Sequence, residues 1–199
     1  MILPVFHSHC SGIPPGADID DSVFRLALLD VGMANHLCGL AWRAISDTDD
    51  TRLVNEGGMA EQFAAQELAW QGNSKPELTY WQRKGRRGNA ELDFTVAIGA
   101  DIFPVEVKAG KSGTLKSVDQ YVLRKRVPRA LRFDMNPPSR QQVSHRTRVG
   151  GETAPVTYEI MSLPLYAIGE LPRPPGEAGG ACAGTGTEHD HRMNGKSST

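Results

Sequence analysis

Cysteine is scarce in this chain and widely scattered, with Cys10, Cys38 and Cys182 as the 3 examples among 199 residues. An odd number of distant cysteines without a Cys-x-x-Cys pair indicates neither a disulfide framework nor a zinc knuckle. No run of 18 apolar residues occurs, and the first ten residues lack the basic start and long apolar segment of a secretory signal. These absences argue against a membrane-spanning or disulfide-stapled secreted protein and predict a cytoplasmic one.

Apolar residues are sparse at both ends of the chain, although they make up 39% of the whole. Residues 1–22 are rich in glycine, proline and aspartate, so we expect a disordered or irregular N-terminus. Residues 172–199 hold too few apolar side chains to build a core, which predicts a disordered tail. The Gly-Lys-Ser at 195–197 lacks the first glycine, the strand and the helix of a phosphate-binding loop. No ATPase activity is therefore expected of this chain.

Positive charge is concentrated in one part of the sequence. Residues 81–150 contain 15 Lys and Arg against 6 Asp and Glu, whereas the rest of the chain contains 7 against 17. Such a clustered positive field favours a polyanionic partner, and we expect nucleic acid. The candidate nucleic-acid-binding residues lie in two basic loops and on a following helix, and they are Arg83, Lys84, Arg86, Arg87, Lys111, Arg124 and Lys125.

Two short strands joined by a Gly-Ala-Asp turn are predicted within residues 89–110, which read NAELDFTVAIGADIFPVEVKAG. The first strand alternates polar and apolar residues, and the second resumes a β-rich pattern. Side chains two apart on a strand share a face, so Glu91 accompanies Asp93, and Glu106 accompanies Lys108. If the polar faces of this hairpin coincide, carboxylates and an ammonium group converge at one place.

Grouped carboxylates repel one another and lose hydration, and a divalent cation gives a reason for such a group. Mg²⁺ prefers hard oxygen ligands and uses one or two protein carboxylates. We therefore predict that Asp93 and Glu106 hold Mg²⁺ or Mn²⁺ for phosphodiester hydrolysis. Lys108 would orient the attacking water or offset the charge that develops on the phosphate. The alternative is an exposed hairpin whose charges are merely solvated.

Helices and strands are predicted on both sides of this hairpin. A buried strand at 23–29 precedes a helix at 31–40 that Asp30 caps. The remaining predicted elements are a helix at 59–70 packed through Phe63, Leu68 and Trp70, a strand at 78–82, a helix at 114–127, a strand at 130–135, a long connection at 136–154, and extended segments at 156–161 and 165–168.

Glu61, on the predicted helix at 59–70, has two interpretations. In the first turn of that helix, a glutamate would favour the positive end of the helix dipole. Alternatively, Glu61 leans over the hairpin and joins the metal site. The residues alone leave both interpretations open.

The order helix, three strands, helix and strand resembles the core of the PD-(D/E)xK nuclease superfamily. An acid lies on the first helix, an aspartate on the second strand, and Glu-x-Lys on the third. The resemblance implies that Glu61 is the helix acid, that Asp93 and Glu106 bind the metal, and that Lys108 is the catalytic lysine. It also places Gln120 where several members of the superfamily have a glutamine. The implied fold is a restriction-endonuclease-like α/β core (αβββαβ) with a mixed central sheet flanked by helices.

A resemblance to a second family covers most of the chain. The blocks LALLDVGMANHLCGL, GGMAEQFAAQEL, YWQRKGRRGNAELDF, FPVEVKAGKSGTLKSVDQY and SLPLYAI resemble an uncharacterised C-terminal domain of prokaryotic AAA-type ATPases. This resemblance implies a nuclease-like domain at 52–171, preceded at 23–45 by the remnant of an upstream helical or winged segment. It also implies an AAA-type ATPase as a partner or as a missing upstream module.

Together these observations predict a metal-dependent nuclease-like domain that acts on or binds DNA. Nucleases of this superfamily that cut both strands are often dimers, so a homodimer is a further expectation. The alternative is a non-catalytic DNA- or protein-binding module of an ATPase system, in which Glu106 and Lys108 make a simple ion pair. The sequence leaves the choice between them open.

Overall fold

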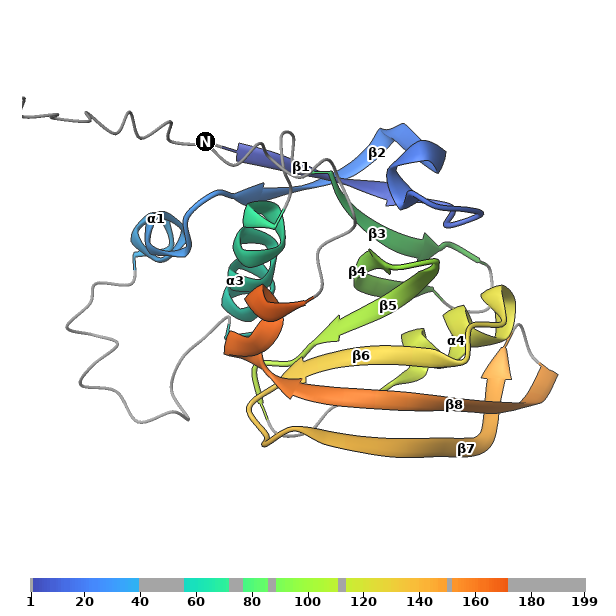
Figure 1. Cartoon of the computed structure of the whole chain (residues 1–199). Helices are drawn as coiled ribbons and strands as arrows, with labels where there is room; N and C mark the ends of the chain where they lie inside the picture. The colour runs from blue at the N-terminus through green and yellow to red at the C-terminus, as the bar shows by residue number, and fades with distance from the viewer. Residues whose placement is uncertain are drawn as a thin grey trace, which may run out of the picture.

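The structure is a computed structural model and describes residues 2–39, 56–71, 77–85, 89–110, 114–149 and 152–171. Thirteen elements follow one another along these residues, and Figure 1 labels the strands and the α-helices. They are β1 (Ile2–Ser8), η1 (Pro15–Asp18), β2 (Ile19–Leu28), α1 (Val31–Leu37), α3 (Glu56–Trp70), β3 (Leu78–Arg83), β4 (Ala90–Ile98), β5 (Asp101–Val107), α4 (Lys116–Lys125), β6 (Arg129–Asp134), β7 (Ser139–Val149), β8 (Glu152–Pro164) and η2 (Leu165–Glu170).

All eight strands belong to one mixed sheet with the order β2-β1-β3-β4-β5-β6-β8-β7. Neighbours are parallel at β1/β3, β5/β6 and β6/β8, and antiparallel at the other four junctions. The predicted α/β class with a mixed sheet flanked by helices is therefore confirmed. The sheet is larger than the predicted core, because strands are added at both edges.

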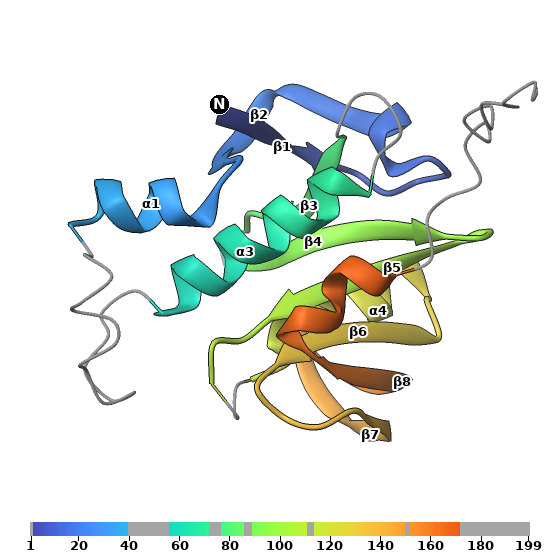
Figure 2. The same ribbon diagram turned by 60° about the vertical axis from the view of Figure 1, so that its left-hand side comes forward.

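Helices cover both faces of the sheet (Figure 2). On one face, α3 and η2 pack over an apolar cluster that includes Ala64, Phe94 and Val105. On the other face, α4 packs over a second cluster, which includes Leu92 and Tyr121. Small alanines on α3 let this helix lie close to the sheet, since Ala60, Ala64, Ala65 and Ala69 are all buried. Among the described helices, none has the length and hydropathy that a membrane span requires.

The expected irregular N-terminus is wrong, because residues 2–8 and 19–28 form a hairpin of the sheet. Alternating apolar residues on β1 explain this, since Leu3 and Val5 are buried in the core that α3 covers. Apart from Pro4 in β1, the glycine and proline residues of this segment lie between the two strands. The predicted strand at 23–29 is present, but as an edge strand of the same sheet, with Leu26 65% exposed.

The predicted long connection at 136–154 is also wrong, because it contains all of β7 and the start of β8. These strands pair along their whole length, from Ser139↔Ser162 to Val149↔Glu152. The sequence of β7 is almost entirely polar because it is an edge strand, and Val143 alone among its described apolar side chains packs against the core. The predicted extended segment at 165–168 is a 3₁₀ helix, η2, which begins directly after Pro164.

The other predicted elements are present, with shifted ends. The Asp30 carboxylate accepts a hydrogen bond from the Met33 backbone N–H at 2.7 Å, as predicted for a helix cap, but this helix ends at Leu37. The helix predicted at 59–70 begins at Glu56, and Trp70 is 67% exposed rather than packed. The predicted tail at 172–199 and residues 40–55 lie outside the described residues.

Two neighbouring residues of β1 provide a test of this hairpin. Leu3 is buried, whereas Ile2 is 57% exposed on the opposite face of the strand. We expect Leu3→Ala to lower the free energy of unfolding by about 2 to 4 kcal/mol, because it leaves a cavity in the core. Ile2→Ala should change it by less than about 0.5 kcal/mol. Urea unfolding of both variants measures this difference, and equal effects would show that residues 2–8 do not pack as described.

Candidate functional site

The predicted hairpin is formed by β4 and β5. These strands are antiparallel, with Phe94 opposite Val105 and Ile98 opposite Asp101. Continuing this register by one residue places Asp93 beside Glu106. The hairpin thus brings together the two carboxylates that the sequence suggested as metal ligands.

A bulge in β4 changes the direction of Asp93. Between β3 and β4 the pairing shifts from Thr79↔Thr95 to Trp81↔Leu92, so two steps along β3 face three steps along β4. Leu92 packs in the α4 cluster and Phe94 in the α3 cluster, although the two residues are two positions apart. The bulge therefore interrupts the regular alternation of the strand at Asp93. Bulges of this kind are common next to functional sites.

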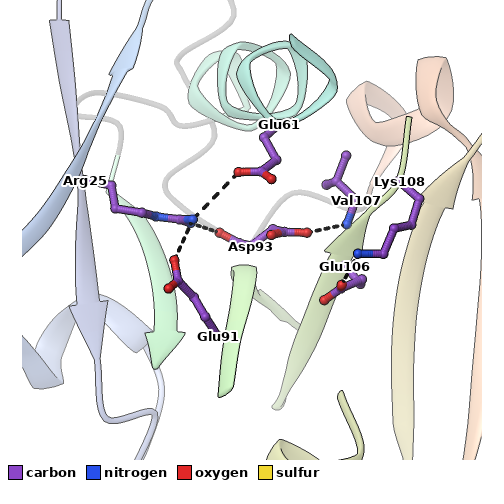
Figure 3. A network of polar contacts seen from close by, with 7 residues as sticks. All are labelled: Arg25, Glu61, Glu91, Asp93, Glu106, Val107 and Lys108. Atoms are coloured by element: carbon purple, nitrogen blue, oxygen red, sulfur yellow. Dashed lines mark hydrogen bonds and ion pairs between the residues drawn. The ribbon is translucent and has the colours of Figure 1, made fainter. Parts of the chain in front are cut away.

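Glu91 and Asp93 belong to one group of charges, but their carboxylates contact different partners. The Asp93 Oδ2 atom accepts a hydrogen bond from the Val107 backbone N–H at 2.7 Å. Glu91 points in the other direction, toward Arg25, and accepts a hydrogen bond from its Nη1 atom at 3.0 Å (Figure 3). Asp93 is thus fixed against the end of β5, beside Glu106, whereas Glu91 lies on the opposite side of the group.

Glu106 and Lys108 do share a face, as predicted. The Lys108 ammonium lies 2.5 Å from Glu106 Oε1, and the exposed fractions of the two side chains are 28% for Lys108 and 7% for Glu106. The other carboxylate oxygen, Glu106 Oε2, is buried and has no hydrogen-bond partner within the described part of the chain. A buried oxygen without a partner is costly, so this atom is available to a ligand.

The three acids near Lys108 are all harder to ionise than free side chains. Burial, followed by the negative charge of Asp93, raises the pKa of Glu106 from 4.5 to about 7. Burial is also the main cause that raises the pKa of Asp93, where the hydrogen bond from Val107 opposes it. Burial and then the charge of Asp93 raise the pKa of Glu61. Loss of hydration is thus the main reason why these carboxylates resist ionisation, and the charge of Asp93 adds to it at Glu61 and Glu106.

The surroundings of Lys108 favour its charged form, whereas those of the acids favour the neutral form. Burial lowers its pKa, but the hydrogen bond to Glu106 and the charges of Glu106, Asp93 and Glu61 outweigh burial, so the net shift is upward. Lys108 accordingly remains an ammonium group at neutral pH. In this arrangement it donates hydrogen bonds and positive charge, and it does not act as a general base.

Glu61 approaches the hairpin from helix α3. Its Oε2 atom lies 3.8 Å from Arg25 Nη1, and its side chain is 41% exposed. Because α3 begins at Glu56, Glu61 lies in the second turn and not in the first. The helix dipole is consequently a weak explanation for this glutamate, since its effect falls off within the first turn. Figure 3 shows Glu61 directed from the helix toward Arg25 and Asp93.

Arg25 is the residue of this group that sequence reasoning missed. It comes from the edge strand β2 and also donates a hydrogen bond to the Asp93 backbone carbonyl. Its guanidinium carbon lies 4.3 Å from the centre of the Tyr80 ring. The available signal was alternation on β2, because Val23, Arg25 and Ala27 form the inward row. A charged residue in an inward row needs a partner, and here the partners are Glu61 and Glu91.

The remaining predicted site residues are less closely gathered. Gln120 lies on α4, and its side-chain oxygen is buried without a hydrogen-bond partner among the described residues. Arg83 and Lys84 lie at the end of β3, which is the end of the sheet where Lys108 follows β5. Arg124 and Lys125 lie in the last turn of α4. Of the other predicted residues, Arg86, Arg87 and Lys111 lie outside the described residues.

The position of α4 separates the basic candidates into two groups. The start of α4 is beside the hairpin, because Ser117 Oγ accepts a hydrogen bond from the Glu91 backbone N–H at 3.4 Å. At 1.5 Å per residue, Arg124 and Lys125 lie about 10 to 12 Å further along the helix. The structure therefore brings Arg83 and Lys84 to the same end of the sheet as the carboxylates, but not Arg124 and Lys125.

The donors present suit a hard cation of the Mg²⁺ type. Among the residues that the structure describes, no group of three His, Cys, Asp or Glu side chains is arranged to hold one metal ion. This argues against a site built wholly from protein ligands. Mg²⁺ commonly keeps several waters and uses one or two carboxylates, and Asp93 with the free Oε2 of Glu106 matches that requirement.

Part of the chain matches a known protein family. Residues 56–144 match the model of a domain of unknown function (DUF4143). The matched segment runs from α3 into β7 and includes Glu61, Asp93, Glu106 and Lys108, but not Arg25. Neither the curated proteins nor the solved structures contain a match to this chain.

The raised pKa of Glu106 predicts how stability depends on pH in the metal-free protein. Between its ordinary value of 4.5 and about 7, the folded protein holds a proton that the unfolded chain has lost. The free energy of unfolding should therefore fall as pH rises through this window, by on the order of 2 kcal/mol. Glu106→Gln should remove most of this fall.

Urea unfolding between pH 4.5 and 8 in a chelating buffer measures the effect. Glu152→Gln, which changes an exposed glutamate of β8, is the matched control and should follow the wild type. If the curves of the wild type and Glu106→Gln stay parallel across this range, the burial and charge effects assigned to Glu106 are incorrect.

Proposed function

We propose that this chain is a divalent-metal-dependent nuclease that hydrolyses phosphodiester bonds in DNA. The observation that carries the proposal is Glu106, which is buried beside Asp93 with one unpartnered oxygen and with Lys108 at 2.5 Å from the other. Burying this group is costly for stability, because Lys108 pairs with only one of its carboxylate oxygens and the other is left without a partner. The arrangement is therefore better explained by a bound metal ion than by folding alone.

Each residue has a role that follows from its position. Asp93 and Glu106 would hold Mg²⁺ or Mn²⁺, which would polarise the phosphate and lower the pKa of a bound water. Asp93 is held in place by the Val107 backbone N–H, so its free oxygen has a fixed direction. Lys108, as an ammonium group, would position the attacking water and offset negative charge on the phosphate. Glu61 would assist from α3, either directly or through a water molecule.

The order of elements supports the finer assignment to the PD-(D/E)xK superfamily. The segments α3, β3, β4, β5, α4 and β6 follow one another as helix, three strands, helix and strand. The acidic residues and the lysine lie on α3, β4 and β5 and just after β5, as in that pattern. Within the larger sheet, these elements would form the restriction-endonuclease-like core, with β1, β2, β7 and β8 added around it.

The partners remain proposals with different support. DNA binding is supported by the surplus of Lys and Arg between residues 81 and 150, and by Arg83 and Lys84 at the carboxylate end of the sheet. An AAA-type ATPase partner rests on the sequence resemblance alone, as does a homodimer.

Nuclease activity can be tested by incubating the protein with supercoiled and linear DNA in the presence of Mg²⁺ or Mn²⁺. Asp93→Asn should reduce cleavage by about 100-fold or more, because it removes the charge that holds the cation. Asp101→Asn is the matched control, since Asp101 lies at the other end of the same hairpin and pairs with Arg129 at 2.6 Å. Equal products from wild type and Asp93→Asn would reject the assignment.

The second candidate function is a non-catalytic DNA- or protein-binding module. The short ion pair between Glu106 and Lys108 favours this function, because the pair satisfies one carboxylate oxygen without a metal ion. Titration calorimetry with Mn²⁺ separates the two functions. The nuclease should bind Mn²⁺ at one site that Glu106→Gln weakens by about tenfold or more, since a carboxylate ligand is lost. Absence of Mn²⁺ binding to the wild type would favour the module.

A further inference from the structure

The side chain of Arg25 lies within the acidic group, although it belongs to the N-terminal hairpin outside the matched family segment. Its Nη1 atom is 3.0 Å from Glu91 Oε1 and 3.8 Å from Glu61 Oε2, and its Nη2 atom donates to the Asp93 carbonyl. One guanidinium group thus contacts residues of α3 and β4. It is the positive charge that lies opposite Lys108 in the site (Figure 3).

The contacts of Arg25 differ in strength. The contact with Glu61 is long, and the side chains of Glu61 and Glu91 are 41% and 47% exposed, so both side chains still reach water. Exposed ion pairs of this kind contribute little and exchange easily. By contrast, stacking over Tyr80, with Phe94 at 5.9 Å, fixes the plane of the guanidinium. The two aromatic rings therefore fix the orientation of the guanidinium more firmly than the long ion pair with Glu61 does.

Space for a ligand lies beside Arg25 and Glu61. A pocket of about 110 Å³ is lined by these two side chains and otherwise mainly by apolar residues of β2, α3 and β4, and it adjoins the acidic group only through Arg25 and Glu61. This space is enough for a few water molecules, each of which takes about 30 Å³ in the liquid. The two hydrogen bonds described for Arg25 use two of the five N–H donors of a guanidinium group. Donors thus remain for a further oxygen ligand.

We infer that Arg25 is an exchangeable counterion that becomes the phosphate-binding residue of this site once a divalent cation neutralises Glu61. This inference rests on the proposed function. In the metal-free protein, Arg25 balances the charges of Glu61 and Glu91. When a cation is bound, the guanidinium turns its free donors toward a non-bridging oxygen of the phosphodiester, because a guanidinium fork fits two phosphate oxygens. The N-terminal hairpin thereby supplies a residue that binds the substrate.

Two opposite effects of one substitution test this role. Arg25→Gln should strengthen Mn²⁺ binding by about threefold to tenfold, because it removes a positive charge beside the acids. The same substitution should weaken cation-dependent binding of DNA by about tenfold, because a charged hydrogen bond to phosphate is lost. A purely structural arginine would not change the two affinities in opposite directions.

Arg25→Lys separates charge from shape. It keeps the positive charge, so its Mn²⁺ affinity should stay within about twofold of the wild type, whereas its DNA affinity should fall because an ammonium group lacks the planar fork. Arg129→Gln is a matched control. Arg129 pairs with Asp101 at 2.6 Å and lies 5.1 Å from the Phe103 ring, but it is at the other end of the hairpin. This control should change neither affinity.

The measurements are Mn²⁺ calorimetry and fluorescence anisotropy of a labelled phosphorothioate duplex with and without Mn²⁺, with a gel to confirm that the duplex stays intact. If the wild type binds no Mn²⁺, the proposed function fails, and the inference fails with it. If the wild type binds Mn²⁺ but Arg25→Gln behaves like Arg129→Gln, the inference alone is overturned. If Arg25→Gln does not fold, Arg25→Lys decides, and unchanged affinities for both ligands overturn the inference.

Discussion

The loss of hydration at three neighbouring carboxylates is the constraint on which the organisation of the candidate site depends. Glu106 is buried, Asp93 is fixed beside it, and Glu61 approaches from α3, and each of these acids is harder to ionise than a free side chain. Lys108 and Arg25 supply two positive charges from opposite sides. Burying like charges lowers stability, so their retention in the folded protein is most simply explained by a ligand that they bind.

Four elements contribute to this arrangement, and none of them could form it alone. The register of the β4 and β5 hairpin places Asp93 beside Glu106, and the bulge in β4 turns Asp93 toward the backbone of Val107. Helix α3 packs closely through its alanines and so brings Glu61 over the same strand end. The edge strand β2 adds Arg25. The first two strands are therefore part of the candidate site as well as of the sheet.

Local sequence patterns predicted much of the central sheet. The hairpin, its turn, the pairing of Glu106 with Lys108, and the cap at Asp30 follow from alternation and capping within a few residues. Patterns failed at the two edges of the sheet. Edge strands face water on one side, so β7 carries mainly polar residues and resembles a loop. In β1, the proline and glycine residues that follow the strand obscured its alternation of buried residues.

By itself, the sequence predicted that Glu106 and Lys108 share a strand face, because side chains two apart on a regular strand point to the same side. It could not determine the bulge at Asp93, because a bulge depends on the register with β3, a neighbouring strand. Nor could it place Arg25 beside Glu61, since these residues are far apart in the chain and meet only when β2 and α3 pack on the same sheet. Tertiary structure decided the site because charges interact through space, whatever their separation along the chain.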